Sequence, residues 1–308
     1  MVIHIQITKI LLHVDIGILI YNDASNKLGI QIYNTRYAVG GIPRKSKFPP
    51  NTTIQSIIIK MLGDINDSSD PNTRYKSQNL GVWSSTADVD TFFDECNHDT
   101  GYYGATIGSY VTIKDGVYNK EWIIAGFDCE KNHQASDGTI KDNGYGICLI
   151  PKKSLGNYLW DSKSTSKGYY GSTINTSTLV TVANNLKKVL GNHLVLRNVL
   201  LSNSSTSNYY ANSYAWTTAY CTLMSMGQVT GTFASSANKY DDGEANYKLS
   251  LFNYESWSFD AWAWLRGLYG DYSGLYGSGV YSLNTSGGSD YDGCRYNSYG
   301  LRPLIYIR

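Results

Sequence analysis

A run of 32 residues near the C-terminus, 269–300, is built almost entirely from tyrosine, glycine and small polar residues. Tyr, Gly, Ser, Asp and Asn fill 26 of these positions, and only Leu275, Val280 and Leu283 are aliphatic. Such a segment cannot supply a hydrophobic core, so the rest of the chain must form a scaffold that carries it. The same residue alphabet is typical of antibody paratopes, where Tyr gives stiff amphipathic contact area and Ser, Gly and Asn give adaptable hydrogen bonding. The segment therefore predicts a recognition surface, and we expect binding rather than catalysis.

The overall composition agrees with an interface protein. The chain has 308 residues, a formal net charge of +1 and 17% charged residues, so it lacks the basic footprint of a nucleic-acid-binding protein. It contains 27 Tyr against 7 Phe. Because Tyr has an apolar body and a polar tip, it is favoured at wet interfaces. The 30 glycines and the few charges favour a loop-rich, largely β protein without a nucleic-acid partner.

No pattern of residues predicts a metal, a cofactor or a catalytic centre. The histidines show no zinc-site spacing, and nucleotide-binding glycine motifs and the G-x-S-x-G elbow are missing. The acidic run Asp241–Glu244 is interpreted as a solvated turn, with calcium as the alternative. Five cysteines without a C-x-x-C pair predict buried free thiols: Cys96, Cys129, Cys148, Cys221 and Cys294. Cys294, next to Arg295, is the one cysteine expected to be exposed enough for a nucleophile.

Residues 1–75 differ in character from the rest. Ile3, Ile5 and Ile7 alternate with polar residues and predict a strand. The apolar stretch Ile10–Ile20 is also interpreted as strand, because it is interrupted by charge and too short to span a bilayer. We expect no membrane insertion; a secretion signal is the alternative. The polar run Asn66–Arg74 predicts a linker. The expected organisation is an assembly or virion-attachment segment, 1–75, followed by a binding domain, 76–308.

Local patterns predict the elements of the second part. A helix should begin near Ser85, which has capping-box spacing to Asp88, and a second helix should cover Leu179–Leu190, with Ser177 or Thr178 as its cap and Gly191 at its end. A short helical stretch is expected near Trp216–Met226. Short strands are expected at Tyr110–Ile113, Trp122–Phe127, Tyr145–Ile150 and Leu194–Leu201.

Three tryptophans, Trp257, Trp262 and Trp264, precede the Tyr-rich segment. We interpret them as a buried aromatic floor below the loops, with direct stacking on a sugar as the alternative. Asp260 is a candidate ion-pair partner for Arg266 and Arg302, because guanidinium groups suit bidentate carboxylate contacts.

From about residue 108 the chain resembles a lectin-like domain of bacteriophage and prophage proteins from gut bacteria. The resemblance rests on GSYVTIKDG (108–116), KEWIIAGFD (120–128), GYGICLIPK (144–152), NLKKVLG (185–191), WLRG (264–267) and SYGLRP (298–303). The last two bracket the Tyr-rich segment and are the most specific. The chain also resembles the target proteins of diversity-generating retroelements, in which a C-type-lectin fold displays a variable C-terminal segment.

The resemblance implies an α+β, C-type-lectin-like domain with short antiparallel strands, about two main helices and long loops. It implies a scaffold below the site, made of Trp262, Trp264, Arg266, Gly300, Arg302 and Pro303. It also implies variable ligand-binding positions drawn from Tyr269, Asp271, Tyr272, Tyr276, Ser278, Tyr281, Ser289, Tyr291, Asp292, Arg295 and Tyr296.

The expected function is receptor recognition by a phage or prophage protein located on the virion. The expected partner is a bacterial cell-surface protein or glycan, and the protein is expected to be a homo-oligomer. A bacterial surface adhesin of fixed specificity is the first alternative. The C-type-lectin fold is shared with formylglycine-generating enzymes, which use paired cysteines near the C-terminal end. This chain has only Cys294 there, so that activity is the weaker alternative.

Overall fold

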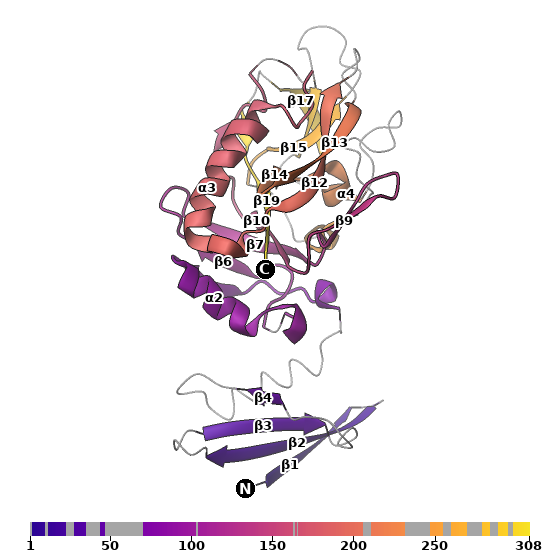
Figure 1. The fold of residues 1–308 in the computed structure, drawn as a ribbon. Coiled ribbons are helices and arrows are strands. Elements are labelled where there is room, and N and C mark those ends of the chain that lie inside the picture. The colour runs from indigo at the N-terminus through magenta and orange to yellow at the C-terminus, as the bar shows by residue number, and fades with distance from the viewer. Residues whose placement is uncertain are drawn as a thin grey trace. The chain divides into compact units, whose positions relative to one another are not determined.

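The computed structural model describes the N-terminal strands and most of the chain after residue 69. The described residues are 2–9, 12–22, 28–34, 44–46, 70–102, 104–162, 164, 166–205, 211–231, 247–254, 260–269, 279–283, 289–294 and 298–308. The chain divides into two compact units, 1–67 and 68–308 (Figure 1).

The N-terminal unit contains a four-stranded antiparallel sheet. Its strands follow one another in the order β1 (Val2–Lys9), β2 (Leu12–Asn22), β3 (Leu28–Asn34) and β4 (Arg44–Ser46). The strand predictions for the two Ile-rich stretches are confirmed. The register pairs Ile5 with Ile16 and Ile18 with both Ile3 and Ile32. Since opposite positions share a face, the register aligns aliphatic positions of three neighbouring strands.

The C-terminal unit is built on a six-stranded sheet in the order β14-β19-β10-β7-β6-β5. All neighbours are antiparallel except β5 and β6. β7 and β10 are almost wholly buried, as expected for central strands with both faces covered. The strands are β5 (Asn79–Trp83), β6 (Tyr110–Ile113), β7 (Lys120–Phe127), β10 (Ile147–Pro151), β14 (Cys221–Leu223) and β19 (Pro303–Ile307).

Two main helices, α2 (Thr86–Glu95) and α3 (Leu179–Leu190), pack against each other at one side of this sheet (Figure 1). The predicted start of α2 is confirmed. The Asp88 carboxylate accepts from the backbone N–H groups of Ser84 and Ser85 at 2.7 and 3.0 Å, and these hydrogen bonds lower the pKa of Asp88. The mixed α+β class is therefore confirmed.

The bounds predicted for α3 are confirmed at both ends, whereas the predicted capping by a Ser177 or Thr178 side chain is wrong. Thr178 has helical dihedrals, because a π-helical turn, Ile174–Thr178, leads directly into α3. Gly191 ends the helix with a φ of 55°, a conformation that favours glycine. The apolar side chains that predicted the helix are all buried: Leu179, Val182, Ala183, Leu186, Val189 and Leu190.

The region after α3 contains more strand than the sequence indicated. β12 (Arg197–Ser205) begins three residues later than expected and pairs with β13 (Ala211–Ala219). The helix predicted near Trp216–Met226 is wrong, because β13 and β14 occupy that stretch and the short helix α4 (Met226–Thr230) begins only at its end. Tyr214, Trp216 and the threonines beside them are good strand formers, which explains the outcome.

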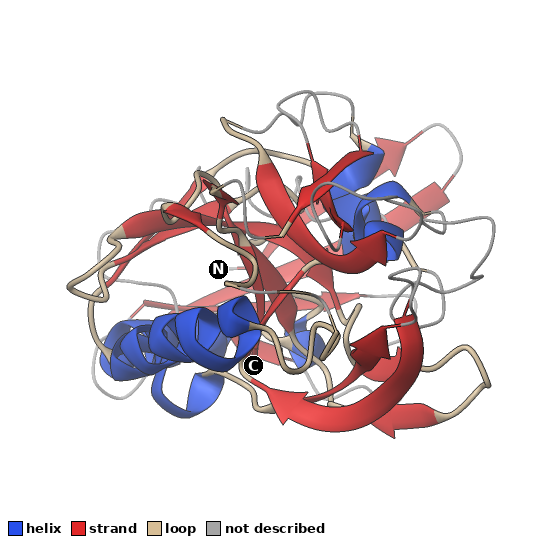
Figure 2. Ribbon diagram, turned by 90° about the horizontal axis from the view of Figure 1, so that it is seen from above, coloured by secondary structure: helices blue, strands red, loops and turns tan. Residues whose placement is uncertain are grey.

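Smaller elements complete the unit. β8 (Asn132–Gln134) and β9 (Ile140–Asp142) form a hairpin, and residues 135–139 make the turn between them. A second sheet has the order β11 (Asn157–Tyr158), β18 (Tyr299–Gly300), β15 (Ala263–Tyr269), β16 (Gly279–Leu283) and β17 (Ser289–Gly293). Short 3-10 turns lie at Pro71–Thr73, His98–Thr100, Gly191–His193 and Ser250–Asn253. Figure 2 shows the helices and strands of the protein from above.

Two further expectations need correction. The run Asn66–Arg74 is not a free linker throughout, since Asn72 exchanges side-chain hydrogen bonds of 3.0 and 2.9 Å with the backbone of Phe127. Cys129 and Cys148 pair as a disulfide, so the prediction of free thiols is wrong for them. The free thiols Cys96 and Cys221 are buried as predicted, and burial raises the pKa of each to about 12.

Candidate binding surface

The Tyr-rich segment forms part of the second sheet. Its described parts are the end of β15 and the strands β16, β17 and β18, and Figure 1 places β17 at the end of the unit farthest from α2. Five predicted contact residues lie in these strands: Tyr269, Tyr281, Ser289, Tyr291 and Asp292. The other six lie outside the described residues: Asp271, Tyr272, Tyr276, Ser278, Arg295 and Tyr296.

The strand register brings two of the tyrosines together. Tyr281 lies directly opposite Tyr291 in the antiparallel pair β16–β17, so these positions share one face of the sheet. Asp292 lies opposite Val280, which is fully buried. Because neighbouring residues of a strand face opposite sides, Asp292 belongs to the other face. The backbone thus groups Tyr281 with Tyr291 and separates them from Asp292.

Beside these strands, in the neighbouring strand β15 of the same sheet, lies the expected aromatic floor. Trp264 is 0% exposed, its indole N–H donates to the carbonyl of Tyr158 at 2.7 Å, and its ring lies 4.5 Å from that of Tyr299. Burial makes Trp264 part of the floor and excludes direct stacking on a ligand. Trp262 is half-buried beside Tyr299, and Trp257 lies outside the described residues.

Two buried arginines tie the floor to neighbouring strands. Arg302 is 0% exposed, donates to the carbonyls of Pro151 and Lys152 at 2.8 and 2.9 Å, and pairs with Asp260. The predicted ion pair with Asp260 is therefore confirmed for Arg302. Arg266 is equally buried and donates to the carbonyl of Leu223 at 3.4 Å. Both guanidinium groups bond backbone carbonyls, so they hold the strands in place from within.

Gly300 sits at a close approach of two chain segments. Its N–H donates to the Trp262 carbonyl at 2.6 Å, and a Cβ there would lie 2.7 Å from that oxygen and 2.9 Å from Ser154 Oγ. Pro303 follows closely as the first, buried residue of β19.

We expect Gly300→Ala to lower the free energy of unfolding by about 1–3 kcal/mol, because the backbone must shift to admit the methyl group. Urea denaturation followed by tryptophan fluorescence measures this loss. Ser298→Ala, at an exposed neighbouring position, is the control and should change stability by less than about 0.5 kcal/mol. Equal stability of the two variants would contradict the close approach.

Cys294 does not have the exposure that a nucleophile needs. It is 0% exposed, and its carbonyl accepts hydrogen bonds of 3.1 Å from the backbone N–H groups of both Trp160 and Asp161. The expectation that Cys294 is accessible is wrong, because the end of β17 turns inward and is fixed there.

The structure contains a buried charged cluster that the sequence did not predict. Glu130, fully buried after β7, contacts Arg197 at 2.7 Å, His133 at 3.2 Å and Gln228 at 2.7 Å. Tyr247 donates to the same carboxylate. These five residues come from four separate parts of the chain, and only Glu130 and His133 are close in sequence, so no local pattern could have grouped them.

Comparisons with known proteins found no match among protein-family models, curated proteins or solved structures. Within the part of the chain that the structure describes, no group of three or more His, Cys, Asp or Glu side chains could hold a metal ion. The acidic run Asp241–Glu244 lies outside that part. Among the described helices, none is long and apolar enough to cross a bilayer.

Proposed function

We propose that this chain is a receptor-recognition protein of a phage or prophage, a retroelement-diversified variable protein that displays a Tyr-rich surface on a C-type-lectin-like domain. The observation that carries the proposal is the contrast between strands rich in Tyr, Ser, Asp and Gly and the fully buried side chains next to them, which include Trp264 of the adjacent strand β15 and Arg302. The partner would be a protein or glycan of the bacterial cell surface.

The hydrogen bonds of the floor support this function physically. Trp264, Arg266 and Arg302 each donate to a backbone carbonyl that lies outside the Tyr-rich segment. Substitutions on the outer positions can then change specificity without removing core contacts. Tyrosines on such a surface are the residues that most often act as binding hot spots.

The proposed homo-oligomer would raise the avidity of such a surface, because linked sites gain effective concentration. The N-terminal sheet supports it. The backbone register aligns Ile5 with Ile16 and Ile18 with Ile32, so aliphatic positions recur on one face of neighbouring strands. A sheet with one apolar face must bury it against another element. We assign this face to contact with a second copy.

Light scattering after size-exclusion chromatography tests the assembly. The full chain should elute as a multimer that persists on dilution to about 1 μM. A monomer at all concentrations would contradict the assignment and would mean that the chain covers this face by itself.

Replacing Tyr272, Tyr276 and Tyr291 together with Ala tests the recognition surface. We expect binding to the host cells to be lost, since each Tyr supplies large contact area, while the melting temperature stays within a few degrees. Flow cytometry with labelled protein and differential scanning fluorimetry measure the two properties. Tyr170→Ala, which removes an exposed tyrosine elsewhere, is the matched control. A large loss of stability in the triple variant would show that these residues are core.

The encoding DNA tests the retroelement link. A nearby near-copy of the codons for 264–302 that differs mainly at adenines, beside a reverse transcriptase gene, would establish diversification. Without such a copy the retroelement proposal fails, and an adhesin or fibre tip of fixed specificity takes its place.

A further inference from the structure

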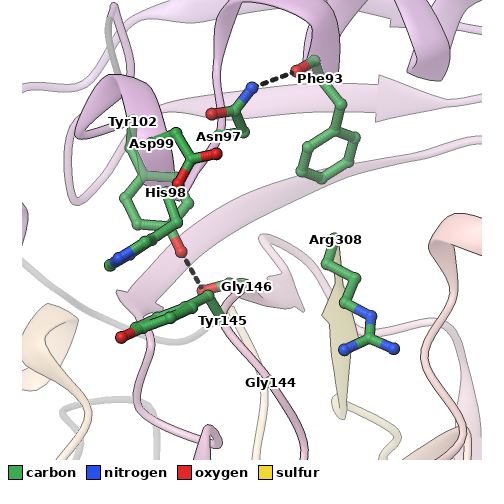
Figure 3. Close-up of a pocket in the computed structure, with 9 residues that line it drawn as sticks. All are labelled: Phe93, Asn97, His98, Asp99, Tyr102, Gly144, Tyr145, Gly146 and Arg308. Atoms are coloured by element: carbon green, nitrogen blue, oxygen red, sulfur yellow. Dashed lines mark hydrogen bonds between the residues drawn. The ribbon is translucent and has the colours of Figure 1, made fainter.

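A cavity of about 350 Å³ lies between the end of α2, the turn before β10 and the end of β19. Figure 3 shows Phe93 pointing into it from above, the rings of His98 and Tyr145 on one side, and Arg308 on the other. This volume is at the lower end of the range for small-molecule sites, which are concave and lined mainly by aromatic and apolar groups with a few polar ones. The cavity therefore has the size and lining of a site for one small molecule.

The wall of this cavity is held by one carboxylate in a strained backbone. Asp128 bonds His98 at 3.1 Å and the Gly146 N–H at 2.9 Å, and it also accepts from the buried Tyr102 hydroxyl. Asp128 and Tyr102 have φ values of 58° and 55°, which side chains other than glycine rarely adopt. Such strain persists only where the surroundings fix it, and it concentrates at ligand sites.

The aromatic wall is fixed as well. His98 stacks on Tyr145 with ring centroids 3.3 Å apart, and the Lys131 ammonium lies 3.8 Å from the Tyr145 centroid. On the other side of the cavity Phe93 stacks on His193 with a centroid distance of 4.8 Å. Because each of these rings packs against a neighbouring ring or cation, the walls of the cavity are ordered without a ligand.

Charges of both signs lie at the rim. Arg308 is exposed, and one arm of its guanidinium donates to the Asn143 carbonyl at 3.2 Å. The exposed Asp99 also lines the cavity. A guanidinium fork matches a carboxylate, and a carboxylate accepts from an ammonium group. A free amino acid presents both groups next to an apolar body.

We propose that this cavity binds a free α-amino acid with an apolar side chain. Its carboxylate pairs with Arg308, its ammonium group lies toward Asp99, and its side chain packs against Phe93 and the exposed ring of Tyr145. The site is separate from the proposed recognition surface, because β17 and α2 lie at opposite ends of the unit (Figure 1).

Titration of the full-length protein with L-phenylalanine, followed by isothermal calorimetry and ligand-observed NMR, tests the proposal. We expect saturable binding below about 10 mM. L-Phenylalaninamide lacks the carboxylate and 3-phenylpropionate lacks the ammonium group, so each should bind at least about 10-fold more weakly. D-Glucose, an uncharged probe of similar size, should not bind. Saturation by glucose but not by phenylalanine, or no saturation by either, would overturn the proposal.

Matched variants locate the contact. Arg308→Gln and Asp99→Asn should each weaken phenylalanine binding about 10-fold, while Asp94→Asn, an exposed carboxylate on α2 that does not line the cavity, should leave it unchanged. Unaltered binding by Arg308→Gln, or equal binding of the amide and the free acid by the native protein, would overturn the carboxylate assignment. The amide comparison needs no variant and so holds even where a substitution affects folding.

Discussion

Replacing Glu130 with Gln is expected to lower the free energy of unfolding by about 3–5 kcal/mol, the range seen when one partner of a buried ion pair is removed. The substitution keeps the shape of the side chain and removes its charge. Arg197, 0% exposed and 2.7 Å from the carboxylate, is then left as an uncompensated buried cation. The melting temperature should fall by roughly 10 °C, measured by differential scanning calorimetry.

The chain offers a matched control for this prediction. Glu121 pairs with Lys152 at 3.2 Å, but both side chains are about 40% exposed. Glu121→Gln should change stability by less than about 1 kcal/mol, because a surface ion pair is screened by water. Similar losses in the two variants would show that burial of the Glu130 cluster does not strengthen it.

A double-mutant cycle separates the ion pair from its surroundings. Arg197 also donates to Thr222 and to the Leu304 carbonyl, so Arg197→Met alone should be strongly destabilising. In the double variant with Glu130→Gln neither charge is left alone. We expect the double loss to be smaller than the sum of the single losses by more than about 1 kcal/mol, since contacting residues are coupled.

The same cluster predicts a pH dependence. Burial alone would raise the pKa of Glu130, but the Arg197 guanidinium and the hydrogen bonds from His133 and Tyr247 lower it well below its ordinary value of 4.5. A depressed carboxyl pKa stabilises the folded state above the unfolded-state pKa, and this contribution is lost as the pH falls. Stability of the native protein should decline below about pH 4.5, and Glu130→Gln should reduce the slope by up to about 1.4 kcal/mol per pH unit. Equal slopes in native and variant proteins would exclude Glu130 as the titrating group.

Elements set by neighbouring residues could be predicted from the sequence. The Ser85–Asp88 capping box determines where α2 begins, and β6 was identified over its full length, Tyr110–Ile113. Both depend on interactions within a few residues, which a local pattern records. The Trp264 floor and the Arg302–Asp260 pair were also expected, because large aromatic and guanidinium groups next to an apolar strand have few alternatives to burial.

Features that depend on distant parts of the chain could not be predicted. A π-helical turn precedes α3 where a capping side chain was expected. The strand β13 forms by pairing with β12, which no local pattern records. The Glu130 cluster joins residues from β8, β12 and α4 with no shared motif. The burial of Cys294 follows from tertiary hydrogen bonds to the backbone of Trp160 and Asp161. Composition predicts a surface segment, whereas tertiary contacts bury some of its residues, such as Val280, Leu283 and Cys294.

Trp264→Ala is expected to lower the free energy of unfolding by about 3–5 kcal/mol. The substitution removes a fully buried indole, its 2.7 Å hydrogen bond to the Tyr158 carbonyl and its packing against Tyr299. It leaves a cavity below β15 that the surrounding strands cannot fill. Urea denaturation followed by circular dichroism measures the loss.

Two further variants separate a structural role of Trp264 from a role in ligand contact. Trp264→Phe keeps an aromatic floor but removes the indole hydrogen bond to the Tyr158 carbonyl, so we expect a loss of about 0.5–1.5 kcal/mol with host-cell binding retained. Trp262→Ala, at a half-buried position, should cost less stability than Trp264→Ala. A Trp264→Ala protein of native stability that no longer binds cells would instead make Trp264 a ligand contact, and the proposed recognition surface would then include this residue.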